Sequence, residues 1–465
     1  MGPQLASVGV IICNHPKMTP DISRRTFVRR TATAGAAFTI LKAGSARTYA
    51  ANEKLNIASV GAGGQAAGDI RNLSSQNIVA LADVDWARAA GTFKKHESAK
   101  TFKDYRKMFD KMASEIDAVI VGTPDHHHFS ASMMAIRLGK PVYCEKPLTH
   151  SIWEARELTL AARKAGVATQ MGNQAQATEQ TRVVQEFVMD KAIGQVREAH
   201  IWTDRPSKGI YGEYWPQGIA RPKEVEKIPN TLDWDLWLGP APERGYNSAY
   251  APRTWRGWWD FGTGALGDIA CHFFDPVFRA LKLGAPDSVE ATSSRANKET
   301  FPLASMITYQ FPKRGDMAPV KLVWYDGGLR PPRHPALTDG DLVGTNGLLL
   351  VGDDGVLLSD WKQWRLLPEK RAKAYGTPPK KLDRSPGHHQ EFIDACKGGK
   401  IAGSNFDWAG PMTEAVLLGN VALRYELRED LTKKKLLWDA KNLKFSNHAA
   451  ANQFLRRDYR KGWEV

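Results

Sequence analysis

Between residues 53 and 174, short apolar runs alternate with longer segments in which apolar residues recur at helical spacing. The segments between the runs, such as Asp104–Met112 and Phe129–Leu138, have the length of ordinary helices. Strands that alternate with helices in this way form a parallel, doubly wound sheet. The strand-like runs are Leu55–Val60, Ile78–Asp83, Lys100–Phe102, Ala118–Gly122, Val142–Cys144 and Ala168–Met171. One helix has clear end signals, because Ser151 and Glu154 have capping-box spacing and Gly166 suits a left-handed C-terminal residue.

After about Gln174 the alternation of strand-like runs and helical segments ends. A helix (Glu179–Lys191) and a strand (Val196–Thr203) lead into a Pro-, Gly- and Trp-rich stretch, residues 205–260. Later strand-like runs are separated mostly by turns, which indicates a largely antiparallel open sheet. These runs are Ser288–Thr292, Ser305–Phe311, Val320–Tyr325, Gly347–Val351 and Val356–Ser359. Two further helices are expected, one opened by Ser385-Pro386 and ending near Gly398, the other opened by Gly410-Pro411 and ending near Arg424. We therefore predict an α/β fold with two domains, 53–174 and 175–465.

Composition and charge narrow the function classes. The chain has 465 residues, 42% of them hydrophobic and 25% charged, which is typical of a globular enzyme with more than one core. The formal net charge is +14, but the first fifty residues hold much of it and the rest shows no nucleic-acid-binding motif. Nucleic acid is therefore not the expected partner.

The first fifty residues have the features of an export signal. Ser23-Arg24-Arg25-Thr26-Phe27-Val28 fits a twin-arginine motif, Ala32–Leu41 is weakly apolar, and Thr48-Tyr49-Ala50 suits cleavage. The apolar run is too short for a stable membrane span. Residues 1–50 are thus predicted to direct export to the periplasm, with translation starting at Met18. The alternative is a disordered basic tail on a cytosolic enzyme.

The first turn of the predicted sheet carries a dinucleotide-binding pattern. Gly61-Ala62-Gly63-Gly64-Gln65-Ala66 directly follows the first strand and precedes a helix. Gly61 permits a tight turn, Gly63 lets the backbone approach a diphosphate, and Ala66 allows close packing of the helix on the strand. Asp83 ends the second strand, where a carboxylate binds ribose hydroxyls and repels a 2′-phosphate. The prediction is a Rossmann domain that binds NAD, with NADP less favoured.

Two further motifs lie where strands end at the ligand-binding edge of such a sheet. Thr123 and Pro124 follow the fourth strand, and Glu145 and Lys146 follow the fifth, so all four are expected at the cofactor. His128 closes a run of three histidines, whose side chains point in different directions and cannot chelate one metal ion well. We expect His128 to pack beside the cofactor and expect no metal. Cysteines 144, 271 and 396 are widely spaced, which predicts buried thiols.

Four motifs together resemble the Gfo/Idh/MocA oxidoreductase family. They are VGAGG at the first turn, GTPDHHH after the fourth strand, CEKPLTHS after the fifth, and GALGDIACHFFDP at residues 264–276. The resemblance implies a Rossmann domain followed by an open α/β domain whose sheet mediates homo-oligomers. It also implies that Lys146, Asp268 and His272 are catalytic.

The chemistry of these residues agrees with that assignment. Asp268 and His272 are four residues apart, so on a helix they share one face, and the carboxylate can orient the imidazole. His272 suits a general base that takes the hydroxyl proton when hydride leaves an alcohol carbon. Lys146 can stabilise the developing alkoxide or relay the proton.

The substrate side is indicated by aromatic residues. Several tryptophans of residues 234–259 offer faces that suit sugar rings, although core packing explains such residues equally well. From this stretch and later residues we predict Arg256, Trp258 and Tyr325 as substrate contacts. The family resemblance adds Asn173 and Gln174.

The function expected from these residues is NAD-dependent oxidation of a hydroxyl in a sugar, sugar acid or polyol. Because the periplasm has no free nicotinamide pool, the cofactor is expected to be tightly held. A second hypothesis is glycoside cleavage through transient oxidation, and a related exported family does this without the lysine that this chain has at Lys146. A third is a non-catalytic sugar- or NAD-binding protein.

Overall fold

The first sheet is built from parallel strands. The computed structural model describes residues 53–209, 212–294, 297–338, 344–427 and 434–465. Within these residues the first sheet has the order β3-β2-β1-β4-β5-β6, the doubly wound order of a dinucleotide-binding fold. Its strands are β1 (Asn56–Val60), β2 (Asn77–Ala82), β3 (Lys100–Phe102), β4 (Ala118–Val121), β5 (Val142–Glu145) and β6 (Thr169–Gly172). The predicted parallel α/β domain is therefore confirmed.

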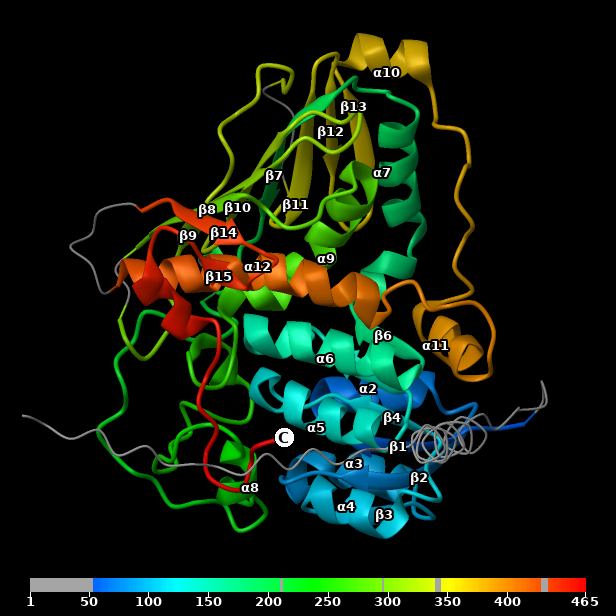
Figure 1. The fold of residues 1–465 in the computed structure, drawn as a ribbon, viewed down its shortest axis with the longest axis vertical. Coiled ribbons are helices and arrows are strands. Elements are labelled where there is room, and N and C mark those ends of the chain that lie inside the picture. The colour runs from blue at the N-terminus through cyan, green and yellow to red at the C-terminus, as the bar shows by residue number, and fades with distance from the viewer. Residues whose placement is uncertain (1–52, 210–211, 295–296, 339–343, 428–433) are drawn as a thin grey trace, which may run out of the picture. The chain divides into compact units, whose positions relative to one another are not determined.

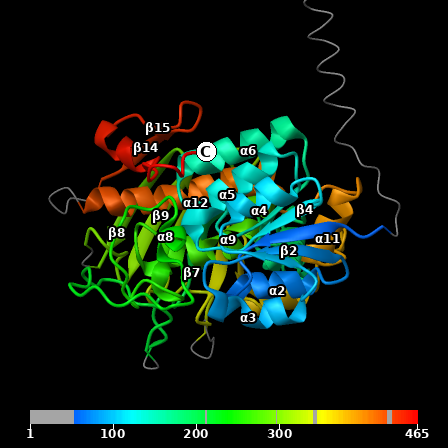
Figure 2. The same ribbon diagram turned by 90° about the horizontal axis from the view of Figure 1, so that it is seen from below.

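Helices cover both faces of this sheet. Figure 2 shows α2 and α3 on one face and α4, α5 and α6 on the other. Their bounds are α2 (Gly64–Asn72), α3 (Trp86–Lys95), α4 (Tyr105–Met112), α5 (Asp125–Arg137) and α6 (Ile152–Ala165). The predicted ends of α6 are confirmed, because the Ser151 and Glu154 side chains cap it reciprocally and Gly166 has φ +66°. Helix α5 starts earlier than the pattern predicted, since the polar residues 125–128 form its buried first turn.

The second sheet is mixed but mostly antiparallel, as predicted. Its order is β13-β12-β11-β7-β10-β9-β8-β14-β15, and β7 with β10 is its parallel pair among the described strands. The strands are β7 (Val196–Trp202), β8 (Ser288–Ser293), β9 (Ser305–Phe311), β10 (Val320–Tyr325), β11 (Gly347–Gly352), β12 (Val356–Ser359), β13 (Trp364–Leu367), β14 (Leu436–Asp439) and β15 (Lys444–Phe445). The last three were not predicted, because each is short and lacks a clear period-two pattern.

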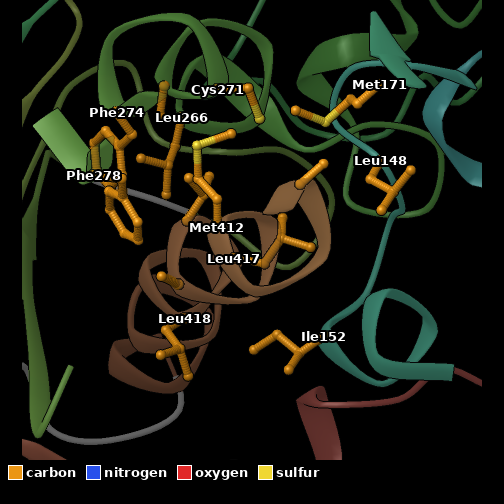
Figure 3. Close-up of a cluster of buried hydrophobic side chains, with 14 of the residues drawn as sticks. Leu148, Ile152, Met171, Leu266, Cys271, Phe274, Phe278, Met412, Leu417 and Leu418 are labelled. Carbon is orange, nitrogen blue, oxygen red and sulfur yellow. The ribbon is translucent and has the colours of Figure 1, made fainter. Parts of the chain in front are cut away.

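Two long helices, α9 (Gly264–Leu281) and α12 (Phe406–Glu426), lie between the two sheets (Figure 1). Figure 3 shows Met412 of α12 among apolar side chains from both domains, including Leu148, Ile152, Leu266 and Phe274. Helix α12 begins at Phe406, so the predicted start at Gly410-Pro411 is wrong. Pro411 removes one helical hydrogen bond, yet the apolar contacts of the surrounding turns keep the helix continuous. One core thus fixes the second sheet against the dinucleotide domain.

The remaining helices are shorter. They are η1 (Gln174–Ala177), α7 (Glu179–Met189), α8 (Trp234–Leu238), η3 (Thr254–Gly257), α10 (Glu369–Tyr375), α11 (His388–Cys396) and η4 (Ala449–Phe454). The predicted helix after Ser385-Pro386 is confirmed as α11, while α10 was not predicted. None of the helices in the described ranges is long and apolar enough to cross a membrane. The predicted export signal lies outside the described residues.

Two segments cross over the dinucleotide domain. Residues 231–233 run beside the loop that joins β2 to α3, where the Asp233 amide donates to the Val84 carbonyl (2.9 Å) and the Trp86 amide to the Thr231 carbonyl (3.1 Å). The chain after η4 passes the start of α6 and then α8 (Figure 1), and the Trp153 amide donates to the Leu455 carbonyl (2.9 Å). Its last residues lie beside α4 and α5, where Val465 lines a hollow together with Phe109 and Met134. Both segments lie near the ligand-binding edge of the first sheet.

Candidate active site

The glycine-rich turn has the geometry that a diphosphate site requires. Gly61 has φ +92°, and a Cβ there would lie 2.8 Å from the Gly122 carbonyl oxygen, so only glycine fits. A Cβ on Gly122 would in turn lie 2.6 Å from the Ala66 Cβ, which shows how closely α2 packs on the end of β4. Gly64, with φ +58°, opens α2 with its free amides at the turn. The predicted roles of Gly61 and Ala66 therefore agree with the structure.

Asp83 holds the same turn in place. Its Oδ2 accepts from the Ala62 amide (2.8 Å) and the Gly63 amide (3.0 Å), and its Oδ1 accepts from the Asp85 amide (2.9 Å). A carboxylate has about four acceptor sites, so about one is left for a ligand. The sequence predicted that Asp83 binds both ribose hydroxyls. In the structure its carboxylate has room to accept from one of them.

Arg88 of α3 lies over the glycine-rich turn and was not predicted. A Cβ on Gly63 would lie 2.7 Å from the Arg88 Cγ, and one on Gly64 would lie 2.6 Å from Nη2. Burial, and the nearby positive charge of Arg253, lower the pKa of the Arg88 guanidinium. A concentration of positive charge beside free helix amides suits a diphosphate. No sequence motif marks Arg88, because its place over the turn depends on how α3 packs.

One cavity connects the glycine-rich turn with the ends of β4 and β5. Its floor includes Gly61 and Gly63, the loops after β2, β3 and β4, and Lys146 after β5. Segments from the rest of the chain form the other side: Leu232, Leu236, Trp237, Trp255, Arg256 and the C-terminal Trp463. The glycine-rich turn, the carboxylate of Asp83 and the positive charge of Arg88 line one cavity and together fit a dinucleotide, so the chain's own residues are suited to hold NAD.

The far end of the cavity holds a buried charge cluster. The Lys146 ammonium donates to the Asp268 Oδ1 (2.8 Å) and to the Asp268 carbonyl (2.7 Å). Arg256 donates from Nε to the same Oδ1 (3.0 Å). Burial opposes ionisation, but the charges of Lys146 and Arg256 hold the pKa of Asp268 below its usual range. Two cations on one carboxylate leave a positive excess where an alkoxide would form.

His272 lies one turn further along α9. Burial, with the nearby charge of Lys146, lowers the pKa of His272 to about 3, so the imidazole is neutral at neutral pH. Its Nδ1 is buried without a hydrogen-bond partner among the described residues, and its ring packs edge-on against Trp361. The carboxylate of Asp268 is engaged by Lys146 and Arg256, so the predicted orienting contact with His272 is not what the structure shows.

The other predicted cofactor residues occupy the edge between β4 and β5. Thr123, Pro124 and Glu145 line the cavity. His128 does not line it, and its ring nitrogens contact the Pro147 carbonyl (2.7 Å) and the Thr123 carbonyl (2.9 Å). His128 therefore joins the two loops that carry the motif residues, in keeping with the expected packing role.

Glu145 belongs to a buried carboxyl pair. Burial, and the neighbouring Asp69, raise the pKa of the Glu145 carboxyl well above its usual range. Its Oε1 accepts from the Gln174 amide at 2.6 Å. The Gln174 amide also donates to the Tyr143 hydroxyl (3.0 Å). Because both contacts are within the protein, the structure does not show Gln174 free to contact a substrate. Asn173 donates to the Cys271 carbonyl (3.3 Å), while its buried Oδ1 has no partner among the described residues.

Two predicted substrate residues are wrong. Trp258 is fully buried in an aromatic cluster, where its indole donates to the Ala249 carbonyl (2.9 Å). Tyr325 contacts the His200 ring through its hydroxyl (3.1 Å) and belongs to a separate apolar cluster with Trp202. Residue type predicted aromatic surfaces but could not tell which of them face a ligand. Of the tryptophans in residues 234–259, Trp237 and Trp255 line the cavity.

The three consecutive histidines are buried in the first turn of α5. His126 and His127 both contact the Trp237 carbonyl through Nε2, each at 2.9 Å, so they pack against the segment that roofs the cavity. Within the described part of the chain, no group of His, Cys, Asp and Glu residues is arranged to hold a metal ion.

Comparisons with known families match both halves of the chain. Residues 55–173 match the Gfo/Idh/MocA model described as "Oxidoreductase family, NAD-binding Rossmann fold". Residues 211–317 match its companion, described as "Oxidoreductase family, C-terminal alpha/beta domain". The first match covers all strands of the first sheet, and the second covers α8, α9 and the strands β8 and β9 of the second sheet.

Curated relatives match over part of their length. Inositol 2-dehydrogenase 2 of Saccharopolyspora erythraea is 38% identical over 98 residues, 20% of this chain and 28% of that protein. 1,5-Anhydro-D-fructose reductase of Ensifer adhaerens is 34% identical over 88 residues, 19% of this chain and 26% of its own. Inositol 2-dehydrogenase of Rubrobacter xylanophilus is 32% identical over 149 residues, 31% and 42% of the two chains. The alignments thus span less than half of each of these relatives.

Solved structures share the fold over most of the chain. The WlbA dehydrogenase of Bordetella pertussis, solved with NADH and UDP-GlcNAcA, has a TM-score of 0.56 at 15% identity, covering 83% of this chain and 100% of its own. A levoglucosan dehydrogenase, solved with NADH, has a TM-score of 0.52 at 16% identity, covering 81% and 97%. At these identities the likeness shows the fold.

Proposed function

Because this chain belongs to the Gfo/Idh/MocA family of NAD-binding oxidoreductases, we propose that it transfers a hydride between NAD and a hydroxyl-bearing carbon. The proposed substrate is a sugar, sugar acid or polyol. The single observation that carries the proposal is the ion cluster of Lys146, Asp268 and Arg256 in a cavity that begins at the glycine-rich turn.

The residues divide the chemistry between them. Bound NAD supplies the acceptor for the hydride. Lys146 stabilises negative charge on the substrate oxygen, because Asp268, which Arg256 also binds, holds the Lys146 ammonium at a fixed position in the cavity. We assign the hydroxyl proton to His272, because its imidazole is neutral at neutral pH and its Nδ1 has no partner among the described residues. Negative charge developing on a bound substrate would raise the low pKa of His272 toward the range that a general base needs. In the reverse direction the same groups return the proton.

Asp268 acts through Lys146 rather than on the substrate. Its carboxylate fixes the ammonium, and its lowered pKa keeps it ionised at neutral pH. Arg256 reinforces that state from the roof segment, and its guanidinium also stacks on the Trp255 ring at 4.3 Å. The proposed catalytic centre therefore draws on both the first domain and the segment that covers it.

We further propose that the protein is exported to the periplasm with NAD already bound. The twin-arginine motif at Arg24 and Arg25 supports the route, which carries folded proteins. Segments that roof the cavity support retention, because they lie over the loop after β2 and would have to part for the dinucleotide to leave.

The test is mass spectrometry of the nucleotide released by denaturing the exported protein, followed by a panel of sugars, sugar acids and polyols read by nicotinamide absorbance. The expected results are NAD near one per chain and formation of NADH with at least one member of the panel. Absence of nucleotide together with weak binding of added NAD would contradict the retention. If the protein releases nitrophenol from nitrophenyl glycosides and no NADH accumulates, glycoside cleavage replaces net oxidation as the proposed function.

A further inference from the structure

The C-terminal residues of the chain reach the nucleotide cavity, and Trp463 lines it. We propose that Trp463 is part of the binding site for the adenosine half of the dinucleotide. This inference rests on the proposed NAD-dependent function, and it assigns a binding role to a segment more than three hundred residues away from the glycine-rich turn.

The position of Trp463 within the cavity indicates which half of the ligand it meets. In a doubly wound sheet the adenosine lies beside the end of β2, where the acidic residue contacts its ribose. Trp463 shares the cavity with Asp83 after β2 and with Lys103, Asp104 and Tyr105 after β3. The Lys146 cluster lies at the other end, after β5. Trp463 therefore belongs to the adenosine end.

The indole is held in a defined orientation. The Arg106 guanidinium lies 4.0 Å from the centre of the Trp463 ring. The rings of Tyr105 and His127 meet it edge-on, with centroids 6.1 Å and 5.5 Å away. Trp463 is 6% exposed, so little of it is left to water in the chain alone. Because Arg106 covers the ring and little of the indole is exposed, Trp463 meets a ligand through the small part that reaches the cavity, as a fixed piece of its wall.

The residues before Trp463 tie the tail to the roof of the cavity. Arg460 donates from Nη1 to the Asp235 carboxylate (2.6 Å) and from Nε to the Gly239 carbonyl (2.9 Å). Arg106 of the dinucleotide domain donates from Nη1 to the Gly462 carbonyl (3.2 Å). The tail thus connects α4 of the dinucleotide domain with the loop around α8.

A second anchor lies further back along the tail. Glu154, whose side chain is fully buried at the start of α6, accepts from Arg457 Nε (2.8 Å) and from the Tyr459 hydroxyl (2.6 Å). A buried carboxylate bound by both residues costs stability if either is lost, so the tail is fixed independently of any ligand. Trp463 is therefore in place before the nucleotide arrives.

The test measures nucleotide binding without turnover. Protein freed of nucleotide is titrated calorimetrically with NAD, ADP-ribose and nicotinamide mononucleotide, for wild type and Trp463→Ala. Loss of the part of the cavity wall that the indole forms predicts that affinity for NAD and for ADP-ribose falls by the same factor, about five- to thirtyfold. Affinity for nicotinamide mononucleotide should remain within about twofold.

Trp438→Ala is the matched control, because Trp438 of β14 is 8% exposed and packs against Phe445 away from the cavity. It should leave all three affinities unchanged. Trp463→Phe, which keeps an aromatic ring, should fall between wild type and Trp463→Ala and serves if the alanine variant does not fold. Equal losses in the Trp438 and Trp463 variants, or an equal loss for nicotinamide mononucleotide, would overturn the assignment.

The outcome is separable from that of the proposed reaction. A selective loss of ADP-ribose affinity in Trp463→Ala would support the binding role even if no sugar in the panel is oxidised. Conversely, oxidation of a sugar with unchanged ADP-ribose affinity in the variant would uphold the reaction and reject the role of Trp463.

Discussion

The two ends of the cavity are built in different ways. At the chemical end, Lys146, Asp268 and Arg256 form a buried ion cluster in which each charged group has a close partner. At the adenosine end, Asp83 is tied to the glycine-rich turn, and Trp463 closes the wall. In the proposed function the first end concentrates charge to stabilise a reacting oxygen, whereas the second recognises adenosine through one carboxylate and a fixed indole in its wall. Substitutions at the first should therefore change rates, and substitutions at the second should change affinities.

The largest effect is expected for Lys146→Ala. Loss of the ammonium removes the group that stabilises the alkoxide, so kcat should fall by roughly a hundred- to ten-thousandfold. Steady-state kinetics on the sugar found by the panel measure this loss, and calorimetry with ADP-ribose is the control for the other end of the cavity. A loss of less than tenfold in kcat, or a matching loss of ADP-ribose affinity, would contradict the separation of the two ends.

A smaller rate effect is expected for Arg256→Gln. Removing this positive charge raises the pKa of Asp268, because Lys146 alone then stabilises the carboxylate. The acid limb of the kcat/KM profile should therefore move to higher pH, and kcat should fall by about ten- to a hundredfold. Arg253→Gln is the matched control, since Arg253 is an exposed neighbour in the same loop. The interpretation fails if both variants show the same profile as wild type.

Asp83→Asn should change affinity at the other end. The amide oxygen can still accept from the turn, but the negative charge that repels a 2′-phosphate is lost. The ratio of NAD to NADP affinity should fall by about tenfold, with kcat at saturating NAD within about twofold of wild type. Glu97→Gln, which alters an exposed carboxylate of the same domain that does not line the cavity, should leave the ratio unchanged.

The smallest effect concerns stability in acid. Burial lowers the pKa of His127 to about 3, so the folded protein resists a proton that the unfolded chain accepts below about pH 6.5. Between those two values His127 makes stability fall as pH falls, by about 1.4 kcal/mol per pH unit. His127→Gln should lose less stability on acidification than wild type does, measured by denaturant unfolding at pH 7 and pH 5. Parallel losses in the two proteins would show that His127 is not held neutral.

The comparison also explains what the sequence could and could not predict. Gly61, Asp83 and Lys146 lie at strand ends, where short motifs and strand order determine position, so both the sheet and the cluster around Lys146 could be predicted. Trp463 could not, because its place depends on a tail that returns to the first domain through ion pairs with remote residues. Arg88 was missed because only its contact with the glycine-rich turn reveals its position.

The wrong predictions have a common physical cause. Trp258 and Tyr325 have side chains that suit a sugar, but the same side chains suit a core, and only the packing of distant segments decides between them. Pro411 lies inside α12 although prolines commonly mark a helix start, since the buried faces of the helix outweigh one lost hydrogen bond. The pattern of apolar and polar residues therefore predicted the helices and strands better than it predicted which of their side chains are buried and which are exposed.

The most direct test of the account is to follow the transferred hydride. A substrate from the panel is labelled with deuterium at the carbon that is oxidised and mixed in a single turnover with NAD-loaded wild type and Lys146→Ala. The account predicts that the nicotinamide released from wild type carries the deuterium, and that the variant transfers almost none in the same time. Reduced nicotinamide without the label, or equal transfer by both proteins, would contradict hydride transfer in the cavity that ends at Lys146.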